Sequence, residues 1–216
     1  MKWMIPWLLL LLSLPGSGQS VDPIVMLDVR TRPARIATGE LAEFSSLPDA
    51  RRQLIETALA VVWESPWLPY LAGGADPAAG GFDCSGAMYF VMRKAGLDPP
   101  RSSGAQMEWL GKNGRLHLVA AEATDPQHPS LADLKPGDLL FWVVTGPGGT
   151  VRVHHVAMYL GTEKKDGRPV MIGSTDGRSY RGQRANGYGV HDFRVPKAEA
   201  ASRLLGYGTP PGIGVE

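Results

Sequence analysis

The stretch FDCSGAMYFVMRKAG, residues 82–96, contains the only cysteine of the 216-residue chain. Apolar residues recur at helical spacing after Cys84, and Gly96 suits a helix C-terminal cap, so the stretch predicts a helix that begins at the cysteine. A thiol there lies at the positive end of the helix dipole, which lowers its pKa, and the unpaired N–H groups of the first turn can stabilise an oxyanion. A lone cysteine can instead be a small core residue. The position favours a nucleophile.

The composition indicates a soluble globular protein with one domain, because 44% of the residues are hydrophobic and 20% are charged. The 22 basic and 21 acidic residues nearly cancel, which argues against a dedicated nucleic-acid binder. Residues 1–20 have one lysine, an apolar run and small residues, in the order of a secretory signal peptide. The alternative is a buried helix or an anchor.

The predicted signal peptide places the protein in an exported setting, with no stable membrane span after cleavage, since the apolar run is shorter than the roughly 20 residues of a spanning helix. Exported proteins usually pair their cysteines. A single unpaired Cys84 in that setting indicates that its chemistry is used.

The chain divides into a signal peptide (1–20), an N-terminal extension (21–47) that forms an extended arm or a leader, one domain (48–208) and a C-terminal tail (209–216). Besides the helix at Cys84, a helix is expected from about residue 48 to Pro66. Buried or half-buried strands are expected over 138–144, 151–160, 169–174, 189–195 and 204–207. Helices followed by strands predict an α+β domain with an antiparallel sheet.

Two adjacent histidines, His154 and His155, lie inside the apolar strand expected over 151–160. Side chains alternate along a strand, so the two imidazoles should face opposite sides, and one of them can face the helix that carries the cysteine. That imidazole is the candidate general base. The alternative is a pair of structural histidines. His117 and His128 lie in a polar connection, and His191 lies in a late strand.

Five segments in order resemble the NlpC-type cysteine peptidases, papain-like enzymes of bacterial cell walls. They are PYLAGG (69–74), FDCSG (82–86), PRSSGAQ (100–106), LKPGDLLFW (134–142) and HVAMYLG (155–161). The resemblance implies N-terminal helices packed on an antiparallel sheet or half-barrel. It makes Cys84 the nucleophile and His155, not His154, the base.

The same resemblance assigns Tyr70, Asp83 and Ser85 to binding the free amino end of the substrate. Other roles are open for two of them, since Asp83 can cap the helix and Tyr70 can be a core aromatic. Arg101 and Gln106 also match the family, and we favour structural roles for both. The same holds for the KPGD turn (135–138), in which Asp138 is expected to bond to the backbone of the turn.

The chain departs from the family at the residue that orients the base. A polar residue, often histidine, usually follows on the next strand, but VMIGSTDG (170–177) has Gly173 at the aligned position. Ser174 and Asp176 are the nearest polar residues, and a backbone carbonyl or a water is the alternative. We assign Ser174 as the third catalytic residue.

The sequence and the resemblance together predict an exported, periplasmic or secreted bacterial endopeptidase. Its partners are peptidoglycan stem peptides, and the resemblance implies cleavage after D-glutamate, commonly before diaminopimelate. No metal or other cofactor is expected, and the sequence makes no prediction of oligomeric state. Two alternatives have different activities: an amidase or acyltransferase with the same fold, and an exported protein that binds wall peptides without cutting them.

Overall fold

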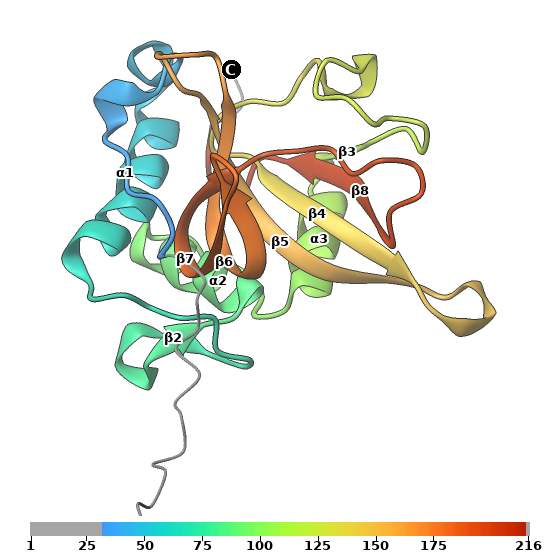
Figure 1. Ribbon diagram of the computed structural model, residues 1–216, viewed down its shortest axis with the longest axis horizontal. Coiled ribbons are helices and arrows are strands. Elements are labelled where there is room, and N and C mark those ends of the chain that lie inside the picture. The colour runs from blue at the N-terminus through green and yellow to red at the C-terminus, as the bar shows by residue number, and fades with distance from the viewer. Residues whose placement is uncertain (1–31, 215–216) are drawn as a thin grey trace, which may run out of the picture.

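The computed structural model describes residues 32–214 (Figure 1). The predicted signal peptide and the first part of the N-terminal extension lie outside the described residues. The α-helices are α1 (Asp49–Glu64), α2 (Cys84–Lys94) and α3 (Ser103–Lys112). Short 3₁₀ turns occur at Thr38–Glu40, Phe44–Ser46, Pro77–Ala79, Pro129–Leu131 and Pro147–Gly149. Within the described range, no helix has the length and apolarity needed to cross a membrane.

Six strands form one antiparallel sheet with the order β3-β8-β4-β5-β6-β7. Their bounds are β3 (Leu116–Leu118), β4 (Leu139–Thr145), β5 (Val151–Thr162), β6 (Pro169–Tyr180), β7 (Gln183–Asp192) and β8 (Ser202–Gly208). A small hairpin of β1 (Ala75–Asp76) and β2 (Gly81–Phe82) precedes α2. The β4–β5 hairpin projects beyond the rest of the domain (Figure 1).

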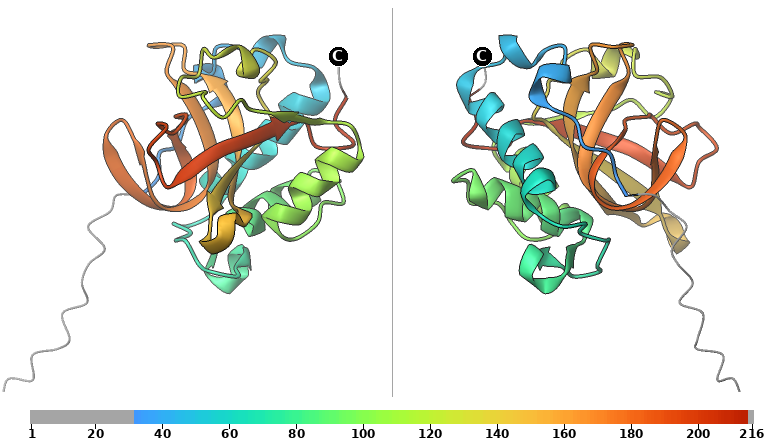
Figure 2. Two further views of the ribbon diagram at one scale, coloured as in Figure 1. Left: turned by 90° about the vertical axis from the view of Figure 1, so that its right-hand side faces the viewer. Right: turned by 60° about the vertical axis from the view of Figure 1, so that its left-hand side comes forward.

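The two faces of the sheet have separate apolar cores. On one face, α1 and α2 pack against strand residues such as Phe141, Val156 and Ile172. On the other face, Trp142, Ala157 and other residues of alternate strand positions pack against the 119–134 connection and against residues 193–195. Figure 2 shows the helices gathered on one side of the curved strands. The alternation of strand side chains therefore decides which residues face the start of α2.

The described part of the N-terminal extension lies against the domain. Ala34 forms an antiparallel bridge with Val190 of β7, and Leu41 forms one with Glu163. Ile36 and Leu41 are buried in the helix-side core. This segment therefore covers part of the sheet edge and contributes apolar surface to the core.

A buried ion pair connects α1 to the start of β4 and to Thr209, the residue after β8. Arg51 of α1 donates to Asp138 Oδ1 at 2.9 Å and to the Pro136 carbonyl at 2.7 Å. Its second terminal nitrogen donates to the Thr209 hydroxyl at 2.6 Å, and that hydroxyl donates to Asp138. Asp138 also accepts from the Lys135 N–H at 2.9 Å, which confirms its expected bond to the turn backbone.

The predicted α+β half-barrel is confirmed, as are the two expected helices and the five expected strands. Several elements differ from the prediction. Strands β1, β2 and β3 were not predicted, and the strand expected over 189–195 ends at Asp192. Helix α3 was not predicted, although Ser102 caps it by accepting from the Ala105 N–H. Strands β6 and β7 extend through polar, glycine-rich sequence to a turn at Arg181 and Gly182. Such sequence has low strand propensity, and its pairing comes from the neighbouring strand.

Candidate active site

Cys84 is the first residue of α2, at the point where β5 and β6 part. Asp83 caps the helix by accepting from the Gly86 N–H at 2.6 Å. The Cys84 thiol donates to the main-chain carbonyl of His154 at 3.8 Å, a distance suited to sulfur. The pairing of β5 with β6 is confined to residues from Met158 onward, so the start of α2 reaches β5 where that ladder is open.

A β-bulge in β5 sets the orientation of the two histidines. Trp142 of β4 pairs with His155 and the next residue pairs with Val153, so His154 is an extra residue in the ladder. The two imidazole centroids lie 6.3 Å apart, and both residues line the same surface pocket. The prediction that the two rings face opposite sides is wrong, because regular alternation stops at a bulge.

In the resting protein, the thiol of Cys84 and the imidazole of His155 are both uncharged at neutral pH. Burial raises the pKa of the Cys84 thiol, and the nearby N–H of Val156 offsets only part of that rise. This differs from the lowered pKa expected for a helix N-terminus, because desolvation outweighs the helix. Burial lowers the pKa of His155 well below its ordinary value, and the charge of Arg178 acts in the same direction. Within the described structure, no hydrogen bond joins the thiol to the imidazole.

The neutral pair predicts a particular pH profile for alkylation of Cys84 by iodoacetamide. Thiolate forms only as pH rises through the raised pKa of the cysteine, while His155 is already neutral above its lowered pKa. The alkylation rate of the free protein should therefore keep rising above pH 8.5, about the pKa of an ordinary cysteine. Mass spectrometry of the single cysteine measures the rate, with a cysteine-containing peptide as the control. A rate plateau below pH 7 would show a thiolate–imidazolium pair instead.

Asp83 and Ser85 are held in place by Arg101. The Asp83 carboxylate accepts from Arg101 at 2.8 Å, from the Gly73 N–H at 3.0 Å and from the Ser85 hydroxyl at 3.1 Å. Burial alone would raise the pKa of Asp83, but the hydrogen bonds from Arg101 and Gly86 bring it below its ordinary value. The Asp83 carboxylate is therefore charged. The amino end of a substrate that binds this carboxylate would compete with the guanidinium of Arg101, which already occupies it.

Arg101 and Gln106 have the structural contacts that were favoured for them. Arg101 also donates to the carbonyls of Gly73 and Gly74, and Gln106 donates to the carbonyls of Ser85 and Pro100. Gly86 is required by the same packing, since a Cβ at this position would overlap the Gly74 carbonyl oxygen. The loop before α2 and the first turn of α2 thus form one rigid unit around the cysteine.

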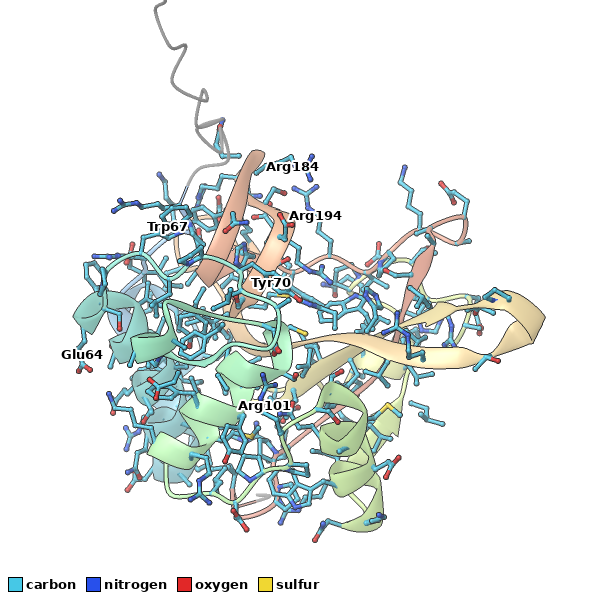
Figure 3. All side chains as sticks on the ribbon, turned by 90° about the horizontal axis from the view of Figure 1, so that it is seen from below. Glu64, Trp67, Tyr70, Arg101, Arg184 and Arg194 are labelled. Carbon is cyan, nitrogen blue, oxygen red and sulfur yellow. The ribbon has the colours of Figure 1, made fainter. Side chains whose placement is uncertain are left out.

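Tyr70 lies beside this unit and lines the pocket that contains both histidines. Its N–H donates to the Asn186 side-chain oxygen at 3.0 Å, and burial raises the pKa of its phenol, to which the charges of Cys84 and Asp83 contribute. Figure 3 labels Tyr70 and Arg101 on the side of the molecule where α2 begins. Asn186 and Arg178, another residue of the pocket wall, were not predicted. Both lie in polar, glycine-rich sequence that carries no motif.

Comparisons with known proteins agree with this geometry. The NlpC/P60 family pattern matches residues 68–188. The chain belongs to the NlpC/P60 family. The resemblance stated from the five segments is thereby confirmed, and the matched range contains the hairpin before α2, all of α2 and α3, and the strands that carry His155 and Arg178.

Curated members of the NlpC/P60 family share part of their length with this chain. A γ-D-glutamyl-L-lysine dipeptidyl-peptidase of Bacillus subtilis is 37% identical over 97 residues, which are 45% of this chain and 26% of that protein. Peptidoglycan endopeptidase RipB of Mycobacterium tuberculosis is 33% identical over 141 residues, 60% of this chain and 48% of that protein. The chain therefore spans between a quarter and a half of these relatives.

Among solved structures, an NLP/P60-family protein similar to a lipoprotein from Staphylococcus aureus has a TM-score of 0.47 and 26% identity. The alignment covers 76% of this chain and 42% of that chain. In residues 32–214, no cluster of three or more His, Cys, Asp or Glu side chains could hold a metal ion.

Ser174, assigned as the residue that orients the base, makes a different contact. Its hydroxyl donates to the Phe82 carbonyl at 2.7 Å and is fully buried. Ser174 alternates with Gly173 and lies on the helix side of the sheet, as Cys84 does. Within residues 32–214, no contact joins Ser174 to the imidazole of His155, whose ring centroid lies 5.3 Å from that of Trp142. The bond to Phe82 gives Ser174 a positioning role for the segment before Cys84, and its assignment as the residue that orients the base stays a prediction. No hydrogen bond links the imidazole of His155 to any other described residue.

Ser174→Ala tests this positioning role. Loss of one hydrogen bond to a buried carbonyl should lower the free energy of unfolding by about 1 kcal/mol, measured by urea denaturation. The pH dependence of kcat should keep its shape, because the hydroxyl does not contact His155. Ser179→Ala, on the same strand, is the matched control. If the acidic limb of the pH profile shifts in Ser174→Ala and not in Ser179→Ala, Ser174 orients His155.

Proposed function

We propose that this protein is an exported cysteine endopeptidase that hydrolyses γ-glutamyl peptide bonds in peptidoglycan stem peptides. The observation that carries the proposal is the placement of Cys84 at the start of α2, with its thiol against the backbone of His154 and next to the base-bearing residue His155. The names of the curated relatives support the substrate class. The signal-like residues 1–20 support export.

The reaction follows from the resting neutral pair. The thiol turns from the His154 carbonyl toward the imidazole of His155, which takes its proton while the sulfur attacks the scissile carbonyl carbon. The N–H groups of Cys84 and Ser85, which lie close to the sulfur, stabilise the negative oxygen of the tetrahedral intermediate.

The intermediate then collapses to products. The C–N bond breaks, and the protonated His155 gives its proton to the leaving amine, which leaves a thioester on Cys84. Water, deprotonated by the same imidazole, attacks the thioester carbonyl, and the thiol is regenerated with release of the carboxylic acid.

The amino end of the substrate is placed next to the start of α2 in this proposal. Tyr70 forms an aromatic wall of the pocket, and Asp83 with Ser85 supplies the charged and hydroxyl groups. For Asp83 to accept a substrate ammonium, that ammonium must share the carboxylate with Arg101. The energetic gain of such a contact is therefore smaller than that of an unpaired carboxylate.

The test is hydrolysis of defined stem peptides. The purified protein is incubated with L-Ala-γ-D-Glu-diaminopimelate, and the products are identified by mass spectrometry. We expect a new amino terminus at diaminopimelate, and we expect Cys84→Ala to lower the rate by at least about 10³-fold. Retention of the rate in folded Cys84→Ala would refute the mechanism. Absence of any cleavage by the intact protein would refute the peptidase function and favour a binding protein.

A further inference from the structure

Arg178 is a guanidinium without an acidic partner at the edge of the candidate active site. It lies within the irregularity of the β6–β7 ladder, between Asp176 and Ser179. Its guanidinium carbon lies 4.1 Å from the centroid of the Trp142 ring, so the group stacks on the indole of the residue that pairs with His155. No hydrogen bond or ion pair joins Arg178 to another described residue.

This arrangement is costly for a charged side chain. Burial lowers the pKa of Arg178 to about 10, which leaves the group charged at neutral pH. Stacking on an aromatic ring returns about 0.5 to 2 kcal/mol. Within the described structure, no protein acceptor binds the planar donors of the guanidinium, and Arg178 is partly exposed to solvent. Arg101, the other guanidinium near Cys84, already binds Asp83. Arg178 is thus a cation of the pocket wall whose guanidinium has no hydrogen-bond or ion-pair partner among the described residues, and it is available to an anion from outside.

The pocket places Arg178 beside the candidate base. Arg178 lines it together with Tyr70, His154 and His155. When Cys84 is ionised, its negative charge raises the pKa of Arg178, so the thiolate and the guanidinium interact electrostatically. An anionic group of a substrate whose scissile carbonyl lies at Cys84 would therefore come within reach of Arg178.

A γ-linked glutamyl residue provides such an anion. Because its side-chain carboxyl group forms the scissile amide, its α-carboxylate stays free. Four carbon–carbon bonds separate the two carboxyl carbons, a span of about 5 Å when extended. A guanidinium binds a carboxylate through two parallel hydrogen bonds and binds a neutral carboxamide less well.

We propose that Arg178 is the subsite for the free α-carboxylate of the γ-linked glutamyl residue on the acyl side of the scissile bond. The inference rests on the proposed peptidase function and adds the residue that selects a carboxylate over a carboxamide. Binding of the carboxylate also neutralises a positive charge next to His155, and so favours proton uptake by the base.

The test compares L-Ala-γ-D-Glu-L-Lys with the same tripeptide in which the α-carboxylate is a carboxamide. For the intact protein, kcat/KM should be about 10- to 100-fold higher for the carboxylate peptide. In Arg178→Met the ratio of the two kcat/KM values should fall to near one, and in Arg178→Lys it should be intermediate. Arg93→Met, which removes an exposed arginine at the C-terminal end of α2, is the matched control and should keep the original ratio.

Two results would overturn the proposal: a ratio near one for the intact protein, or an unchanged ratio in Arg178→Met. If Arg178→Met does not fold by circular dichroism, the ratio in Arg178→Lys decides. If the intact protein cuts neither peptide, the proposed function fails, and calorimetric binding of both peptides to Cys84→Ala judges Arg178 separately. The subsite is supported if Cys84→Ala binds the carboxylate peptide more tightly than the carboxamide peptide and if Arg178→Lys reduces this difference. Equal affinities of Cys84→Ala for the two peptides reject the subsite.

Discussion

His155→Ala should lower kcat on γ-glutamyl peptides by about 10²- to 10⁴-fold, the usual contribution of a general acid–base, whereas His154→Ala should lower it less than tenfold. The two residues are adjacent and line the same pocket, so their positions in the sequence do not separate them. Their contacts do. Cys84 bonds to the main-chain carbonyl of His154, which alanine retains, while the ring of His155 is buried against Trp142 at the bulge.

The measurement is steady-state hydrolysis at neutral pH, where burial keeps His155 unprotonated. Each variant serves as the control for the other, since both remove one imidazole from the same strand. Thermal unfolding of both variants shows whether a loss of rate reflects a loss of structure. An equal loss of rate in the two variants would mean that the imidazole of His154 also takes part in proton transfer.

The parts of the site that could be predicted from the sequence are those fixed by local chemistry. Asp83 before Cys84 is a helix cap by residue type, and the structure shows the cap. The apolar runs of β4 and β5 have strand patterns that do not depend on distant residues. The same applies to the KPGD turn, where the Asp138 carboxylate accepts the Lys135 N–H as expected.

The parts that could not be predicted depend on pairing between distant segments. The bulge at His154 results from a one-residue shift in the register between β4 and β5. The alternation of side chains within β5 alone does not predict this shift. Ser174 is polar and close in sequence to the aligned position, but its side of β6 is fixed by the register with β5 and β7. Arg178 reaches Trp142 across two strands, and no local pattern connects these residues.

Arg51→Met should lower the free energy of unfolding by about 3 to 5 kcal/mol, the range found when one partner of a buried ion pair is removed. The side chains of Arg51 and Asp138 are 4% and 3% exposed, so the carboxylate left behind cannot regain full hydration. The Pro136 carbonyl and the Thr209 hydroxyl would lose a hydrogen bond as well. Urea denaturation measures the change.

Arg52→Met is the matched control for Arg51→Met. Arg52 is the next residue of α1, and its ion pair with Asp49 lies in solvent, where such pairs contribute about 0 to 1 kcal/mol. The double variant Arg51→Met/Asp138→Leu should recover part of the lost stability, because it removes the unpaired charge and leaves apolar groups of similar volume. If Arg51→Met were no more destabilising than Arg52→Met, the buried pair would not hold α1, the start of β4 and Thr209 together. Helix α1 would then depend on its apolar face alone.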